Sequence, residues 1–407
     1  MSPYAPVPAP RAEGPFPSPW LHVARVAAAL AAGMGVGRFV YTPILPLMHA
    51  QAGLSTDAGA HLATANYVGY LLGALAGTLL PALVRSRTVL RGSFVLLVCT
   101  LAAMPATHST TAWIALRLLA GVASALIFVV AVSSLLGHLR NHPAHLPGWG
   151  FGGVGAGIAL SGLLVLALRS VADWQVAWWS SAVLATALAA AAWNLRPEAP
   201  IAPSTDAPEK AVDPWFGALF VSYGLEGVGY IVAGTFLVAA IGQSSPGWIG
   251  SGAWVLVGLA AVPSSALWAR LGRRWSRPAL LCVALVIQAV GIALPALVGG
   301  VAAALVSAVL FGATFIGIST LALATGAELR FPRSVALLTA GYSVGQIVGP
   351  LAVAPLLHHG YRPALLLAAA VVLAAAVAAA VLRAGLPRHA VAPRRSVPAQ
   401  EIRTADR

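Results

Sequence analysis

Long apolar stretches alternate with short polar ones along almost the whole chain. Runs of roughly 20 apolar residues are long enough to cross the hydrocarbon core of a bilayer. Twelve such runs can be identified, at about 21–48, 60–84, 92–108, 111–137, 148–168, 175–195, 214–241, 248–270, 278–298, 300–327, 335–357 and 363–383. The pattern predicts an all-α polytopic membrane protein with twelve transmembrane helices.

Composition supports a membrane protein. Of the 407 residues, 59% are hydrophobic and only 9% are charged, whereas charged residues make up about 25% of a typical soluble domain. So few charges cannot cover a water-facing surface. The two cysteines, Cys99 and Cys282, lie in separate apolar runs, which is typical of small buried hydrophobes. We therefore expect neither a disulfide nor a metal site, and no cofactor.

The basic residues fall almost entirely on one side of the predicted helices. The formal net charge is +13, and all but four of the 24 lysines and arginines lie on the side that holds both termini. The other side has only Arg169 and Arg362, while Arg38 and Arg117 lie inside helices. By the positive-inside rule both termini are cytoplasmic, in a multi-pass protein of the bacterial inner (plasma) membrane. The charge therefore does not indicate a nucleic-acid partner.

The longest polar interruption divides the twelve helices into two sets of six. It is rich in proline, alanine and acidic residues, which predicts a flexible cytoplasmic linker. The predicted order is a disordered cytoplasmic arm at 1–19, an N-terminal half at 20–195, the linker at 196–213, a C-terminal half at 214–384 and a basic cytoplasmic tail at 385–407.

A weak internal repeat supports this division. The first helix of one half contains GVGRF at 35–39, and the first helix of the other contains GVGYI at 227–231. Halves that start on the same side are parallel repeats, and in transporters the solute site lies near the midplane between such repeats. Glycines spaced by four in three spans predict close helix packing. We expect spans 2, 5, 8 and 11 to form the seam along which the two halves meet. The glycines are Gly69, Gly73 and Gly77 in span 2, Gly153 and Gly157 in span 5, and Gly341, Gly345 and Gly349 in span 11.

Five stretches together resemble the YbfB/YjiJ-type family of the major facilitator superfamily: GMGVGRFVYTPILPLM (33–48), NYVGYLLGAL (66–75), YGLEGVGYIVAGTFLVA (223–239), FGATFIGISTLA (311–322) and TAGYSVGQIVGP (339–350). The resemblance implies the major facilitator fold, a small-molecule substrate and transport in place of enzymatic activity. It also implies a proton-coupling role for Arg117, which with Gly121 keeps a pattern associated with that role. The chain departs from the wider superfamily in the loop RSRTVLRG, which lacks the usual acid.

Two charges deep inside helices point to a solute site. An arginine or acid at a helix centre costs about 2.5–3.5 kcal/mol on insertion scales, and such residues usually face a cavity or a partner. Arg38 and Glu226 lie near the middle of equivalent helices in opposite halves. We expect both to face a central cavity, with Glu226 and Arg117 coupling transport to protons. A purely structural Arg38–Glu226 pair is the alternative.

Polar and aromatic residues on the same helix faces complete the predicted substrate site. It comprises Arg38, Tyr41, Thr42, Asn66, Tyr70, Tyr223, Tyr230, Tyr342 and Gln346. These groups predict a monomeric secondary transporter that moves a small organic, and possibly anionic, solute by alternating access. The alternatives are an efflux pump for drugs or sugars, and a transport-inactive receptor or scaffold. The loop histidines His138, His142 and His145 lack a shared helical face because of Pro143, so a metal site there is not expected.

Overall fold

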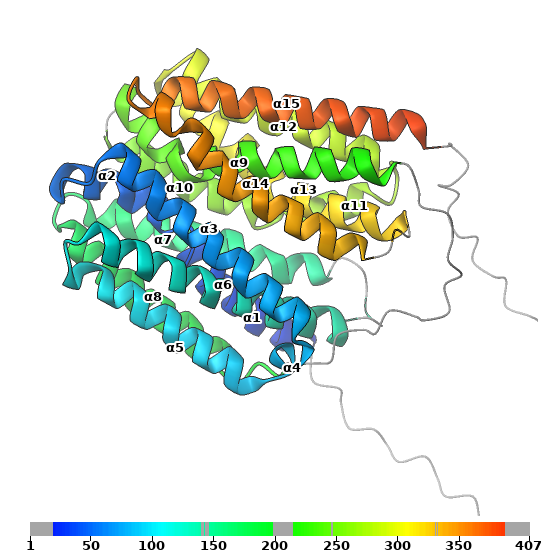
Figure 1. The fold of residues 1–407 in the computed structure, drawn as a ribbon, viewed down its shortest axis with the longest axis horizontal. Helices are drawn as coiled ribbons and strands as arrows, with labels where there is room; N and C mark the ends of the chain where they lie inside the picture. The colour runs from blue at the N-terminus through cyan, green and yellow to red at the C-terminus, as the bar shows by residue number, and fades with distance from the viewer. Residues whose placement is uncertain are drawn as a thin grey trace, which may run out of the picture.

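The helices run side by side along the long axis of the molecule (Figure 1). The computed structural model describes residues 19–139, 142, 146–197, 215–245, 247–329, 331 and 333–386, and this part of the chain contains helices and no strands. The first half comprises α1 (Pro19–Leu30), the π-helical turn η1 (Ala31–Val36), α2 (Tyr41–Gln51), α3 (Thr56–Leu79), α4 (Pro81–Val84), α5 (Arg87–Ala103), the short η2 (Met104–Ala106), α6 (Thr110–His138), α7 (Leu146–Leu168) and α8 (Trp174–Ala192).

The second half repeats the plan of the first. It comprises α9 (Phe216–Ser244), α10 (Gly247–Ala261), α11 (Ser264–Leu271), α12 (Arg277–Leu297), α13 (Gly300–Glu328), α14 (Ser334–Leu357) and α15 (Tyr361–Gly385). In Figure 1 these green-to-red helices lie above the blue-to-teal helices of the first half. The arm predicted at 1–19 and the tail predicted at 385–407 lie almost wholly outside the described residues, as does most of the predicted linker.

The fold class predicted from the apolar pattern is confirmed. Eleven helical segments among the described residues are long and apolar enough to cross a membrane. The twelfth span is not the continuous helix expected at 248–270, because Trp248–Ala261 and Ser264–Leu271 are bent by 41°. The bend coincides with Pro263, which cannot donate a backbone hydrogen bond to a continuing helix.

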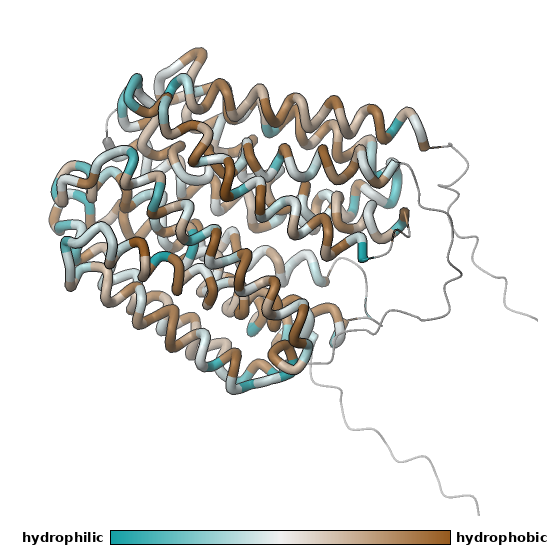
Figure 2. Tube along the Cα trace, in the orientation of Figure 1, coloured by the Kyte–Doolittle hydropathy of each residue, from teal (hydrophilic) through white to brown (hydrophobic). Residues whose placement is uncertain are grey.

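The surface matches a bilayer environment. Many large apolar side chains along the helices are exposed, for example Val183 at 70% and Val377 at 64% exposure. Hydrophilic residues gather toward the ends of the bundle (Figure 2). The end at which α1 begins and α15 ends also holds the arginines that flank α4, α11 and α12. We call it the basic end, and the other the opposite end.

Two pairs of membrane spans carry most of the packing between the halves, with α10 and α11 counted as one broken span. α3 lies against α14, and α7 lies against α10 and α11. These are spans 2, 11, 5 and 8, as the predicted seam requires. Close approach on α7 depends on glycine, because a Cβ at Gly155 would meet the backbone of Val262 at 2.5 Å and of Gly258 at 2.7 Å.

None of the three predicted glycine rows lies in the seam, and that part of the prediction is wrong. A Cβ at Gly73 would meet Val122 of α6, one at Gly153 would meet Ala27 of α1, and one at Gly349 would meet Val228 of α9. Each row therefore packs against a helix of its own half. Spacing by four identifies a face that allows close approach, but it does not identify the helix that uses it.

Candidate functional site

The first span is interrupted where Arg38 lies. The predicted helix at 21–48 is divided, because a π-helical turn ends at Val36 and residues 37–40 form turns before α2 begins. A Cβ at Gly35 would collide with the backbone of Gly157 on α7, so glycine permits this segment to pack against α7. The interruption places Arg38 in the protein interior, with 2% of its surface exposed. Such π-helical segments occur frequently at functional sites.

Arg117 holds this interrupted segment together. Its Nη1 donates to the Gly37 carbonyl and its Nη2 to the Arg38 carbonyl, both at 3.1 Å. The guanidinium also lies 5.0 Å from the Tyr41 ring and 6.0 Å from the Trp178 ring. A broken helix leaves carbonyls without their usual amide partners, and the arginine fork supplies two donors to them. The geometry therefore gives Arg117 a positioning role toward Arg38.

Arg38 reaches across the seam to the other half. Its Nη2 donates to Gln346 Oε1 at 2.5 Å, and Gln346 Nε2 donates to the Tyr230 hydroxyl at 2.8 Å. The guanidinium also lies 4.5 Å from the ring of Tyr70 and 4.8 Å from that of Tyr67. No carboxylate among the described residues forms an ion pair with it. The cation is thus held by neutral groups.

Further hydrogen bonds cross between the halves beside Arg38. Thr42 Oγ1 donates to the Gly234 carbonyl at 2.5 Å, and the hydroxyls of Tyr67 and Thr235 lie 2.7 Å apart. Sequence reasoning missed Tyr67 and Thr235. Tyr67 follows Asn66, which was placed in the site although its side chain donates to the Arg117 carbonyl. The two residues are neighbours on α3, so a small error in the predicted rotation of this helix about its axis is enough to select Asn66 in place of Tyr67.

Two further predicted positions need correction. Asn66, fully buried, serves the α3–α6 contact and does not face the seam. Tyr41 donates to the Gly59 carbonyl at 2.8 Å and stacks with Arg117, so it also lies outside the Arg38 contacts. Its assignment rested on α-helical spacing from Arg38, and residues 37–40 do not follow that spacing.

Glu226 lies apart from Arg38, contrary to the expectation that both face one cavity. It is fully buried in α9, and the polar group beside it is Gln288 of α12, in its own half. Neither carboxylate oxygen, and neither amide atom of Gln288, has a hydrogen bond of normal geometry to a described residue. Gln288 was also missed, because one polar residue in an apolar helix gives no indication of its partner.

A ladder of aromatic rings connects the surroundings of Glu226 with those of Arg38. Tyr223 stacks on Tyr342 at 4.3 Å between ring centres, and Tyr342 lies 5.4 Å from Tyr230. Tyr230 then lies 5.3 Å from Phe315, which meets Phe39 edge-on at 5.5 Å. Three of the five rings were predicted site residues. The ladder brings the two halves together through broad, uncharged surfaces.

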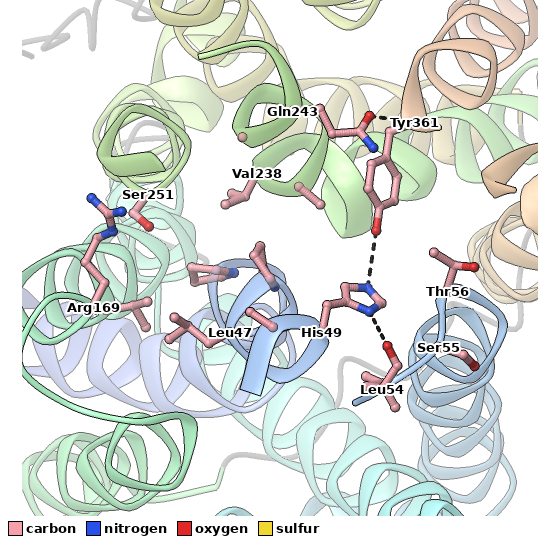
Figure 3. A pocket seen from close by; sticks show the side chains of 16 residues that line it. Leu47, His49, Leu54, Ser55, Thr56, Arg169, Val238, Gln243, Ser251 and Tyr361 are labelled. Carbon is pink, nitrogen blue, oxygen red and sulfur yellow. Dashed lines mark hydrogen bonds between the residues drawn. The ribbon is translucent and has the colours of Figure 1, made fainter. Parts of the chain in front are cut away.

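A cavity of about 800 Å³ lies between the halves at the opposite end (Figure 3). Its walls come from the ends of α2, α3 and α7 in the first half and of α9, α10 and α15 in the second. Pro43 and Pro46 of α2 line it, so the segment that carries Arg38 continues directly into its wall. None of the residues predicted for the site lines this cavity.

Of the loop histidines considered in the sequence, His138 and His142 stack with His22 at the basic end. His138 lies 4.1 Å from His22 and 6.3 Å from His142 between ring centres, and His145 lies outside the described residues. In the described part of the chain, no group of three or more His, Cys, Asp or Glu is placed to hold a metal ion.

Comparison with known proteins assigns the family. A model of the family described as "Uncharacterised MFS-type transporter YbfB" matches residues 30–380. The chain belongs to this family. It is therefore a multi-pass membrane transporter of a small molecule and not an enzyme. The resemblance seen in the sequence is confirmed.

Structural comparison agrees on the fold. A crystal structure of a mutant of the nucleoside transporter NupG matches with a TM-score of 0.66 and 14% sequence identity, covering 89% of this chain and 99% of that one. At this identity the match shows the fold alone. No curated protein sequence matches the chain.

Proposed function

We propose that this family member is a proton-coupled secondary transporter that carries a small organic anion across the bacterial inner membrane by alternating access. The observation that carries the proposal is the state of Arg38. It is a buried cation in the seam between the halves, and its one hydrogen-bond partner among the described residues is the neutral Gln346. An anionic solute would supply the negative charge that the protein does not.

The surroundings of Arg38 suit an organic anion with an apolar part. Phe39, Tyr230, Trp254 and Phe315 surround a narrow apolar gap, and the Arg38 guanidinium lies 5.3 Å from the Phe39 ring; the gap is too small for a water molecule in this conformation and would have to widen to admit a ligand. The Trp254 indole N–H has no hydrogen-bond partner among the described residues, although the side chain is 1% exposed. A carboxylate accepts two N–H donors from a guanidinium in a fork, and aromatic walls bind the remainder of a small ligand.

Two features support alternating access. The halves meet along glycine-rich helices in the seam, and the 800 Å³ cavity lies between them at the opposite end of the molecule. Near the basic end a Cβ at Gly148 would meet Ala266 of α11 at 2.8 Å, so α7 and α11 are in close contact there. The arrangement corresponds to a transporter closed at the basic end and hollowed at the other.

Glu226 is the proposed proton site. A permanent charge in a helix centre is expensive without a partner, and no ion pair among the described residues includes Glu226. Taking up a proton would remove that charge and let the carboxyl group donate to Gln288. Because the Tyr223–Tyr342 stack separates this region from the Tyr230–Gln346–Arg38 chain, we expect coupling to act through movement of α9 and α14. A direct exchange of partners between Glu226 and Arg38 is not part of the proposal.

The substrate is best identified without assuming its structure. Cells that overproduce the protein, and cells that overproduce Arg38→Gln, would be compared for metabolites inside and outside the cell. We expect one or more organic anions to be redistributed by the unmodified protein only. Arg277→Gln is the matched control, because Arg277 pairs with Glu328 at the exposed basic end. The anion proposal fails if Arg38→Gln redistributes the same compounds equally well.

Proton coupling is tested separately in proteoliposomes with the anion so identified. A proton gradient should drive its accumulation by the unmodified protein, whereas Glu226→Gln should only equilibrate it. Accumulation by Glu226→Gln with an unchanged dependence on pH would remove Glu226 from the coupling step. The efflux alternative, in which Glu226 binds cationic drugs, is less supported because Glu226 contacts its own half.

A further inference from the structure

We propose that the cavity at the opposite end is a second binding site for anions, in which Arg169 captures the solute before it reaches Arg38. The inference rests on the proposed function, because the ligand is taken to be the transported anion. It concerns a different part of the molecule and different residues. Arg169 would be the first residue to bind the solute, before the solute reaches the buried Arg38.

Arg169 is a cation at the cavity wall without a partner among the described residues. Its side chain is half-buried at the end of α7 and points toward Ser251 at the cavity wall (Figure 3). In the described part of the chain its guanidinium forms no hydrogen bond and no ion pair. Asp173, one turn further on, instead accepts the Val176 amide hydrogen bond at the start of α8. The cation is therefore available to a ligand.

The lining of the cavity carries positive charge and no negative charge. Besides Arg169 the polar side chains are His49, Ser55, Thr56, Gln243, Ser251 and Tyr361, and no acid lines the cavity. Asp57 lies next to Thr56, but its carboxylate is 3.4 Å from His358 Nε2 in an exposed pair outside the lining. A cleft lined by one sign of charge concentrates ions of the other sign. The cavity therefore favours anions over cations.

The wall that faces Arg169 offers hydrogen-bonding groups to a ligand. His49 Nδ1 lies 2.5 Å from the Leu54 carbonyl, which can only accept, so Nδ1 carries the proton. Nε2 of the neutral ring then accepts from the Tyr361 hydroxyl at 3.2 Å, and Gln243 Oε1 accepts from the Tyr361 amide at 3.2 Å. Figure 3 shows this group across the cavity from Arg169. The Gln243 amide NH₂ is left to donate to a ligand.

The size is appropriate for a small organic molecule. Ligand pockets in proteins commonly measure about 300–1,000 Å³, and this cavity measures about 800 Å³. It would hold an organic anion with its charge on Arg169 and its hydrogen-bonding groups toward Gln243 and Tyr361. Because Pro43 and Pro46 form part of its wall, the bound solute also contacts the segment that carries Arg38.

Charged thiol reagents test the site without knowledge of the substrate. The cavity reporter is Gly242→Cys in a Cys99→Ala, Cys282→Ala background. Gly242 is exposed in the lining, and a Cβ there meets nothing within 4 Å. The rates of modification by anionic sulfonatoethyl and cationic trimethylammonioethyl methanethiosulfonate are measured on purified protein in detergent. The reference reporter, Thr111→Cys, is exposed at the same end outside the cavity.

We expect the anion-to-cation rate ratio to be roughly three- to tenfold higher for the cavity reporter than for the reference reporter. Arg169→Gln should abolish that excess, and Arg169→Lys should retain it. Arg362→Gln is the matched control, because Arg362 lies at the same end but does not line the cavity. Equal ratios at the two reporters, or an excess that survives Arg169→Gln, would overturn the proposal. Labelling requires no transport, so this result stands apart from the tests of Arg38 and Glu226.

Discussion

The contact between Arg117 and the interrupted first span gives a quantitative prediction. Arg117 donates one hydrogen bond to each of two buried carbonyls, those of Gly37 and Arg38, at 3.1 Å. Lysine keeps the charge but loses the planar fork, so it can satisfy one carbonyl well and not both. A hydrogen bond to a charged group contributes about 1.5–3 kcal/mol. Arg117→Lys should therefore reduce the free energy of unfolding by about 2–3 kcal/mol.

Reversible unfolding in mixed micelles, followed by tryptophan fluorescence as the fraction of dodecyl sulfate rises, measures this free energy. Arg91→Lys is a close control, because Arg91 donates to the Trp193 carbonyl at 3.3 Å and lies 4.9 Å from the Trp193 ring. Near the surface such contacts contribute less than about 1 kcal/mol. If Arg117→Lys is no more destabilising than Arg91→Lys, the positioning role is refuted, and the coupling role implied by the family resemblance is favoured.

Three further predictions concern packing and charge. Glu226→Gln should change the free energy of unfolding by less than about 1 kcal/mol in the same assay, because no ion pair is broken; a loss of about 3–5 kcal/mol would indicate a buried pair. Gly121→Ala should destabilise by about 1–3 kcal/mol, since its Cβ would collide with the Asn66 carbonyl. At Gly92, which is also helical, an added Cβ would meet no atom within 4 Å, so Gly92→Ala should stabilise the protein by up to about 1 kcal/mol. Equal effects of the two substitutions would contradict the close α3–α6 contact at Gly121. Tyr361→Phe, which removes the bond to His49, should speed the modification of the Gly242→Cys reporter by a neutral maleimide, and an unchanged rate would show that this bond does not restrict the cavity.

The fold could be predicted from the sequence because the bilayer imposes one rule on every segment. Each span must satisfy its own backbone hydrogen bonds and present apolar side chains to lipid, so the apolar runs mark the helices directly. The interruption at 31–40 follows no such local rule. Its residues are as apolar and glycine-rich as a regular span, and the contacts that hold it open come from Arg117 on α6 and Gly157 on α7.

The sequence predicted which types of residue form the candidate site better than it predicted which way each side chain points. Arg38, Tyr70, Tyr230 and Gln346 do meet at the seam. Tyr41 was misplaced because spacing by three from Arg38 assumes an α-helix through a segment that is not one. Asn66 was assigned to the site because it forms a polar pair with Tyr70 at helical spacing, and Tyr67 was not assigned. In the structure the Tyr67 phenol crosses the seam and the Asn66 amide binds a backbone carbonyl.

The bonds described across the seam around Arg38 share a property that bears on movement. Each has at least one neutral partner: Arg38 with Gln346, Thr42 with a carbonyl, and Tyr67 with Thr235. Hydrogen bonds between neutral groups contribute about 0.5–1.5 kcal/mol each and a bond from a charged group such as Arg38 about 1.5–3 kcal/mol, whereas breaking a buried ion pair costs about 3–5 kcal/mol. Halves joined by an Arg38–Glu226 pair would have to break that pair in every cycle. Halves joined by hydrogen bonds without an ion pair can separate at lower cost, and Arg38 remains without a fixed counterion until a solute provides one.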